Sequence, residues 1–324
     1  MKKNITVSAP GKLMLLGEHA VVYDRPCLVT AVDQRMRATV ELLEIQEFQL
    51  EAADVKVTGY KKSLTKLGKG DIPKGAQFVE IAVKNFFEKF GLKGGIKVTT
   101  KSEFSSQFGF GSSSASTVCV LKALAELSGK KLSEKQIFIL AYKTVLDIQG
   151  KGSGFDVAAA VYGGTLYFVT GGKVIKPLNI NSLPLIIGYS GVKADTVTLM
   201  NQVKEKATKY PEIIEGIYNN IEELIPLAQK ALVKNDWQQV GELMNINQGY
   251  LAALGVSTKK LADMLYAVRD SGGYGAKLSG AGGGDCIIAL APKEKRKEVE
   301  EAITKAGGQV IDVATNAEGV RVEA

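Results

Sequence analysis

The segment from Gly109 to Ser114 carries the clearest chemistry in this sequence. It places two glycines and three consecutive serines directly before a stretch whose apolar residues recur at three and four, which predicts a helix over 115–127. Glycine lets a backbone approach a ligand closely, and the first N–H groups of a helix are unpaired and carry partial positive charge. A simple helix N-cap is the alternative, although a cap needs only one serine. The excess of glycine and serine predicts a phosphate cradle made by Gly109, Gly111, Ser112, Ser113 and Ser114.

Two further glycine-rich segments could serve a reaction. Residues 150–156 place Asp156 on a turn beside Lys151, and a carboxylate held in this way can act as a general base toward a hydroxyl. The plainer alternative is a turn or a helix cap, where Asp after Gly is common. Residues 280–284 have four glycines in five positions, just before an apolar run. We expect either a ligand or a second chain segment to pack against this bare backbone.

Several familiar motifs are missing from the sequence. It has no GxxxxGK[ST] segment, which argues against a P-loop NTPase, and no GxGxxG after a strand with a later acidic residue, which argues against a dinucleotide-binding fold. It has no HExxH segment of a zinc peptidase. His19 is the only histidine, and its neighbours do not support a Ser/His/Asp hydrolase.

The elements that must position these segments follow from periodicity and turn residues. Strands are expected over 4–9 and 13–16, separated by a tight turn at Pro10-Gly11. Strands followed by helices, without strict alternation, favour the α+β class. The stretch 170–173 is the best boundary, which predicts domains over 1–172 and 173–324. The other elements that we expect are a strand pair over 35–50, helices over 77–90, 136–148, 260–270 and 293–306, strands over 95–100, 165–169, 185–189 and 286–290, and a closing strand pair.

The composition is that of an ordinary globular protein. The 324 residues suit two domains of about 150 residues each. The net charge is +7, but most lysines are scattered among glutamates, so nucleic-acid binding is not expected. Cys27, Cys119 and Cys286 lie far apart in apolar runs, which predicts buried free thiols in a reducing compartment. No signal peptide or membrane span is recognisable, so we expect a cytoplasmic location without membrane contact.

Four motifs in order give the chain a resemblance to the GHMP kinase superfamily. They are Pro10-Gly11-Lys12 with Gly17-Glu18-His19, the segment 109–114, Ser153-Gly154-Phe155-Asp156, and the run 280–284. Within the superfamily the chain looks most like the mevalonate kinases, through residues 17–23 and 245–256, while residues 149–160 resemble phosphomevalonate kinases. The resemblance implies a two-domain α+β GHMP kinase fold. Its N-terminal, ATP-binding domain would be ribosomal protein S5 domain 2-like and its C-terminal domain ferredoxin-like.

The resemblance also implies roles for particular residues. Asp156 falls on the family's catalytic aspartate, and Lys12 falls on its N-terminal catalytic lysine. The glycines and serines of the segment 109–114 fall on the phosphate loop, with a serine hydroxyl, which we assign to Ser113, on Mg²⁺. The residues that fall where mevalonate kinases contact the substrate are Glu18, His19 and Thr196.

The implied function is ATP-dependent phosphorylation of the 5-hydroxyl of mevalonate, in isoprenoid biosynthesis, with ATP and Mg²⁺ as cofactors. One departure concerns the metal: mevalonate kinases usually carry a glutamate ligand where this chain has Val145, and Asp147 lies on a different helix face. A phosphomevalonate kinase and a catalytically inactive GHMP-type sensor stay open as alternatives. The expected partner is the small-molecule substrate, and a homodimer is left open. The candidates for binding an additional substrate phosphate are Lys151, Arg25, Arg35 and Arg37.

Overall fold

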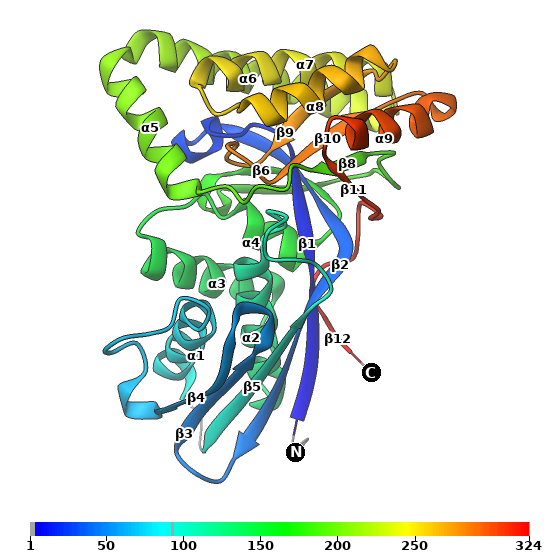
Figure 1. Cartoon of the computed structure of the whole chain (residues 1–324). Coiled ribbons are helices and arrows are strands. Elements are labelled where there is room, and N and C mark those ends of the chain that lie inside the picture. Colours follow the sequence, from blue (N-terminus) through cyan, green and yellow to red (C-terminus); the bar gives the residue numbers. More distant parts are fainter. Residues whose placement is uncertain (1–3, 92–93, 324) are drawn as a thin grey trace.

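The computed structural model describes residues 4–91 and 94–323 and contains two β-sheets with helices packed on them (Figure 1). The larger sheet has the order β12-β1-β2-β5-β3-β4, and β6 and β7 extend it from β2. Its strands are β1 (Asn4–Leu16), β2 (Pro26–Leu43), β3 (Glu47–Ala52), β4 (Val57–Ser63), β5 (Gly95–Ser102), β6 (Thr165–Val169), β7 (Val174–Leu178) and β12 (Arg321–Val322). The helices that accompany it are α1 (Gln77–Phe90), α2 (Ser112–Leu127), α3 (Glu134–Gln149) and α4 (Phe155–Tyr162).

The smaller sheet is antiparallel throughout and has the order β11-β8-β10-β9. Figure 1 shows helices α6 to α8 lying together on the side of this sheet that faces away from β1 and β2. Its strands are β8 (Ile186–Tyr189), β9 (Gly275–Ser279), β10 (Cys286–Leu290) and β11 (Gln309–Ile311). The helices of this half are α5 (Thr196–Lys209), α6 (Pro211–Val233), α7 (Trp237–Leu254), α8 (Lys259–Asp270) and α9 (Arg296–Lys305). Short 3-10 helices are η1 (Ala20–Tyr23), η2 (Ala53–Val55), η3 (Leu64–Lys66), η4 (Thr170–Gly172) and η5 (Lys293–Lys295).

The α+β class predicted from the sequence is confirmed, but two details of the prediction are wrong. Residues 4–16 form one strand, because Pro10 and Gly11 lie at a register shift against β2 and do not turn the chain. A bulge absorbs the irregular backbone and bends the strand while its pairing continues on both sides. The last two strands do not pair with each other, since β11 adds to β8 and β12 adds to β1.

The hydrophobic core continues from one sheet to the other. One buried cluster contains Val29 and Leu50 from the larger sheet together with Ile187 and Ile288 from the smaller sheet. A second cluster lies between the smaller sheet and helices α6 to α8. The domain boundary at 172/173 stays a prediction; β7, just beyond it, pairs with β6 of the larger sheet. Among the residues described, no helix is both long and apolar enough to cross a membrane.

Candidate active site

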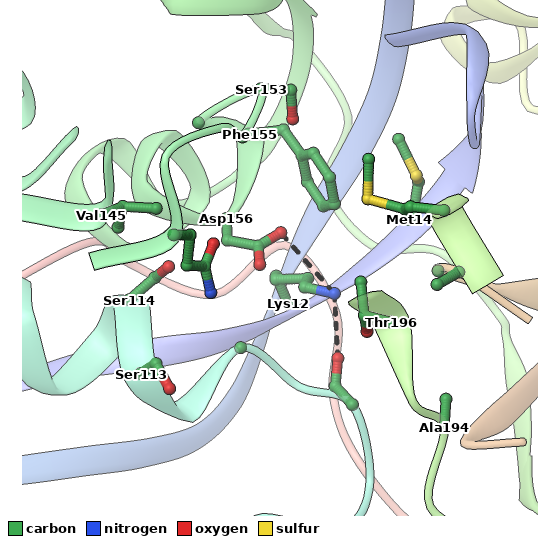
Figure 2. A pocket seen from close by; sticks show the side chains of 18 of the residues that line it. Lys12, Met14, Ser113, Ser114, Val145, Ser153, Phe155, Asp156, Ala194 and Thr196 are labelled. Atoms are coloured by element: carbon green, nitrogen blue, oxygen red, sulfur yellow. Dashed lines mark hydrogen bonds and ion pairs between the residues drawn. The ribbon is translucent and has the colours of Figure 1, made fainter. Parts of the chain in front are cut away.

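A cavity of about 350 Å³ lies where the two halves of the chain meet. Its walls come from the end of β1, the loop before α2, the start of α4 and the start of α5. Figure 2 shows Lys12 at its centre, with Ser113 and Ser114 on one side and Thr196 on the other. The structure therefore brings together, around one cavity, all the site residues predicted from the sequence: Lys12, Glu18, His19, Gly109, Gly111, Ser112, Ser113, Ser114, Asp156 and Thr196.

The loop before α2 presents bare backbone to the cavity. Gly111 occupies the N-cap position with a φ of 78°, and no side chain caps the helix. The hydroxyls of the three following serines, residues 112–114, make no hydrogen bond with other described residues and remain free for a ligand. The simple N-cap interpretation of these serines is therefore wrong. The loop is anchored through Phe110, whose buried ring packs on Phe104 and Phe108.

Helix α4 also opens into the cavity without a cap. Its N-cap is Gly154, with a φ of 90°, and Asp156 lies in its first turn. A Ser, Asp or Thr side chain caps each of α3, α5, α7 and α8, whereas α1, α6 and α9 also lack a side-chain cap. Two positively polarised helix ends therefore face one cavity, which suits a ligand of high negative charge.

Lys12 is held in place by four contacts. Its backbone N–H donates to Phe110 O at 3.0 Å, and its Nζ donates to Gly109 O at 2.9 Å. The Nζ lies 3.7 Å from Asp156 Oδ1 and 5.1 Å from the centre of the Phe155 ring (Figure 2). The side chain is only 7% exposed, so its ammonium is largely withdrawn from water. This fixes one positive charge beside the loop before α2.

Asp156 has an oxygen with an unused acceptor capacity. Its Oδ1 is buried and has no hydrogen-bond partner among the described residues. A buried carboxylate oxygen without a partner is costly unless a ligand supplies a proton or a cation. The Asp156 side chain is 33% exposed and lines the cavity beside Lys12, so a substrate hydroxyl could approach its carboxylate.

Glu18 and His19 reach the cavity from the turn after β1. Lys277 of β9 is fully buried and forms an ion pair with Glu18, whose second oxygen, Oε2, has no partner among the described residues. Burial lowers the pKa of Lys277, and the attraction of Glu18 opposes this shift. Lys277 was not predicted as a site residue, because nothing in the local sequence shows that it meets a residue 259 positions earlier.

His19 is buried, and its hydrogen bond assigns one ring nitrogen as the donor. Burial lowers the pKa of His19, and a hydrogen bond to Ala281 only partly offsets the shift. Its Nε2 lies 2.9 Å from Ala281 O, and a carbonyl oxygen can only accept, so Nε2 carries the proton. The other ring nitrogen, Nδ1, is consequently a hydrogen-bond acceptor and not a positive charge.

The glycines of residues 280–284 serve two purposes. A Cβ on Gly282, Gly283 or Gly284 would collide with Val256, Leu199 or Val192, so these three allow a tight crossing of chain segments. Gly280 has a φ of 105° and open space beside it, and with Ala281 it lines the cavity. The tight crossing is therefore confirmed for Gly282, Gly283 and Gly284, whereas a ligand beside Gly280 stays a prediction.

Asp285 is an acidic cavity residue that the sequence interpretation missed. Its Oδ1 accepts from Ala194 N at 2.9 Å, and its Oδ2 would lie 2.5 Å from a Cβ on Gly109. The carboxylate therefore fills the space behind the phosphate loop, and burial raises the pKa of Asp285. Only a glycine fits at position 109 next to it.

Val145 lines the cavity as a buried apolar residue, as the sequence indicated. Asp147 points elsewhere, because it binds Lys143 and Asn85. None of the three arginine candidates lines the cavity. Arg25 pairs with Glu215 and Glu222, Arg37 pairs with Glu103, and Arg35 is buried against backbone carbonyls near the C-terminal end.

Comparison with known proteins gives a consistent family. The model of the GHMP kinases N terminal domain matches residues 77–164, and that of the GHMP kinases C terminal matches residues 228–309. The chain is 36% identical to a mevalonate kinase of Thermococcus sibiricus, over 98% of both chains. It is 37% identical to one of Pyrococcus horikoshii, over 100% of this chain and 99% of the relative.

A solved structure supports the same family. The mevalonate kinase of Methanococcus jannaschii superposes with a TM-score of 0.83 at 26% identity, covering 97% of this chain and 99% of that one. The two-domain GHMP kinase fold that the motifs implied is therefore confirmed. The chain that holds Lys12 and Asp156 between the uncapped starts of α2 and α4 belongs to the GHMP kinase family.

Proposed function

We propose that this protein transfers the γ-phosphoryl group of ATP to the 5-hydroxyl of mevalonate. The full-length similarity to proteins named mevalonate kinase supports the substrate. The observation that carries the chemistry is the ion pair of Lys12 and Asp156, 3.7 Å apart between two uncapped helix ends, in which Asp156 Oδ1 accepts no hydrogen bond from the described residues. An anion-binding cavity with a poised carboxylate is what a phosphoryl transfer to a hydroxyl requires.

In this site the protein contributes mainly position and charge. The N–H groups at the start of α2 and the free serine hydroxyls would hold the nucleotide phosphates. Asp156 would orient the acceptor hydroxyl and take its proton, and Lys12 would offset the negative charge that develops during transfer. His19 would accept a hydrogen bond from a substrate hydroxyl through Nδ1, because its Nε2 proton is already used.

Glu18 and Thr196 complete the proposed acceptor contacts. Glu18 Oε2 is buried without a partner and could accept from a second substrate hydroxyl. Thr196 is the first residue of α5 and lines the cavity opposite the phosphate loop (Figure 2).

We propose that Mg²⁺ accompanies ATP. Among the described residues no group of three His, Cys, Asp or Glu side chains could hold a metal by itself. Mg²⁺ commonly uses one or two protein oxygens together with phosphates and waters, and the free hydroxyl of Ser113 fits that requirement. When bound, the ion would neutralise phosphate charge.

A coupled ADP-release assay with four acceptors tests the proposal. We expect turnover with mevalonate and little with 5-phosphomevalonate, homoserine or galactose. Turnover with 5-phosphomevalonate in place of mevalonate would refute the acceptor while leaving the kinase chemistry intact. Binding of mevalonate without ATP consumption would favour the inactive sensor.

The proposed setting is cytoplasmic, since Cys27, Cys119 and Cys286 are all buried free thiols. Light scattering of the purified protein can decide between a monomer and the homodimer that the sequence left open.

A further inference from the structure

The cavity has three lysines that differ in what they already bind. Lys12 lies between Gly109 O and Asp156, at the proposed site of transfer. Lys193, in the loop before α5, donates to Ser106 O, beside the phosphate loop. Lys151 follows α3 in the loop that leads to α4. Lys12 therefore lies at the centre of the cavity, Lys193 lies at the proposed nucleotide side, and Lys151 lies at the wall formed by the loop between α3 and α4.

The carboxylate of mevalonate, the proposed acceptor, needs a cationic hydrogen-bond donor that has no other role in the proposed reaction. His19 is unsuitable, because its free ring nitrogen is a hydrogen-bond acceptor. Within residues 4–91 and 94–323, no arginine lines the cavity. Lys12 is committed to the reacting groups and Lys193 to the flank of the phosphate loop. Lys151 is the cation that remains.

The position of Lys151 suits this task. Its Nζ lies 3.4 Å from Asn201 Oδ1, which is a long hydrogen bond to a neutral partner on α5. It forms no ion pair within 4.0 Å among the described residues, so its charge is free to attract an anion. Asn201 is in the first half of α5, after the cavity residues Thr196, Val197 and Met200. The ammonium thus lies at the side of the cavity formed by α5, where an acceptor bound against Thr196 would extend.

We propose that Lys151 binds the carboxylate of the acceptor and, with Asn201, closes the acceptor end of the cavity between the loop before α4 and helix α5. This rests on the proposed mevalonate kinase function. On binding, the carboxylate replaces the Asn201 oxygen as the partner of Lys151, and the Asn201 amide can then donate to the same carboxylate. Lys151 is a specificity residue and takes no part in the proton transfer.

The test combines a change in the protein with a change in the acceptor. The variants are Lys151→Met and Lys151→Arg, and the acceptors are mevalonate and 3-methylpentane-1,3,5-triol, which keeps the hydroxyls but lacks the carboxylate. For Lys151→Met we expect the KM for mevalonate to rise about ten- to thirtyfold, as for loss of a charge-assisted hydrogen bond. The KM for the triol and for ATP should change less than about twofold, and Lys151→Arg should restore most of the loss.

Two comparison variants sharpen the result. Lys131→Met removes an exposed lysine that does not line the cavity and controls for the overall loss of positive charge. Lys193→Met removes the other outer cation. The proposal would be overturned if Lys151→Met raised the KM for mevalonate and for the triol equally, or raised neither. It would also be overturned if Lys151→Met raised the KM for ATP, or if Lys193→Met raised the KM for mevalonate but not for the triol. If the wild-type protein does not turn over mevalonate at all, the proposed function fails instead, so the two failures are distinguishable.

Discussion

At the scale of single residues, the site depends on the carboxylate of Asp156, whose Oδ1 lies beside Lys12 and accepts no hydrogen bond from the described residues. Replacing Asp156 by Asn keeps the size and shape of the side chain but removes its ability to take a proton. We expect kcat to fall at least about a hundredfold, the lower end for loss of general base catalysis, while the Kd for ATP changes less than about threefold. Single-turnover kinetics and calorimetry measure the two quantities. Asp147→Asn, outside the cavity, is the control, and a kcat for Asp156→Asn within tenfold of wild type would exclude the proposed role.

His19 gives a second prediction at this scale, because it is the only histidine in the chain. Its pKa in the folded protein is lowered by burial, so the unfolded chain binds more protons wherever the pH lies between that lowered value and about 6.5. The free energy of unfolding should therefore decrease as the pH falls below about 6.5. In His19→Gln this part of the decrease should disappear. Urea unfolding of both proteins between pH 5 and 8 checks it, and an identical pH dependence would show that His19 does not titrate on unfolding.

The residues that the sequence revealed are those whose partners are local or follow a motif. Lys12, Asp156 and the phosphate loop belong to short segments in which glycine and charge occur together. Lys277 and Asp285 could not be predicted in this way, because what makes them part of the site is contact with Glu18 and with Gly109, far away in the chain. Buried long-range ion pairs have no signature in residue spacing.

At the scale of elements, helices were predictable because they repeat an apolar face, whereas the continuity of β1 was not. A bulge and a turn both attract Pro and Gly, so Pro10-Gly11 could not distinguish them; pairing with β2 decides the outcome. The uncapped start of α2 was predictable from Gly109 and Gly111. Its function as a ligand site depends on the tertiary structure, which turns the start of α4 toward the same cavity.

The start of α2 can be tested through its glycine. Gly111 has a φ of 78°, and a Cβ there would lie 3.3 Å from Lys12 Cε. Gly129 has a similar φ of 66° with open space around it, so Gly129→Ala is a matched control for the backbone strain alone. We expect both alanine variants to lose about 1 kcal/mol of unfolding free energy, and only Gly111→Ala to lose at least about tenfold in kcat. Equal kinetics in the two variants would show that the approach of Lys12 to the loop is unimportant.

At the scale of the whole molecule, the active site also joins the two sheets. Met14 N donates to Ser279 Oγ at 3.0 Å, His19 contacts Ala281, and Glu18 pairs with Lys277. All three contacts connect the end of β1 with β9 or the loop after it. Because the apolar core also continues between the sheets, folding and the assembly of the site should be one event.

Lys277→Met tests this coupling. It leaves Glu18 buried without its cation, which should cost about 3–5 kcal/mol of unfolding free energy, and adding Glu18→Gln should recover part of that loss.

Trp237 of α7, the only tryptophan, reports on the C-terminal half by fluorescence, while far-ultraviolet circular dichroism reports on both halves. We expect the two urea transitions to coincide in the wild type and to move together in the variant. Lys62→Met is the comparison, because the partner of Lys62 is the buried Glu80, which lies within the N-terminal half. Lys62→Met should lower the unfolding free energy and leave the KM for mevalonate unchanged. Lys277→Met should lower the unfolding free energy and also raise that KM. Transitions that separate would mean that the two sheets unfold independently, and the Glu18–Lys277 pair would then serve the site without joining the molecule.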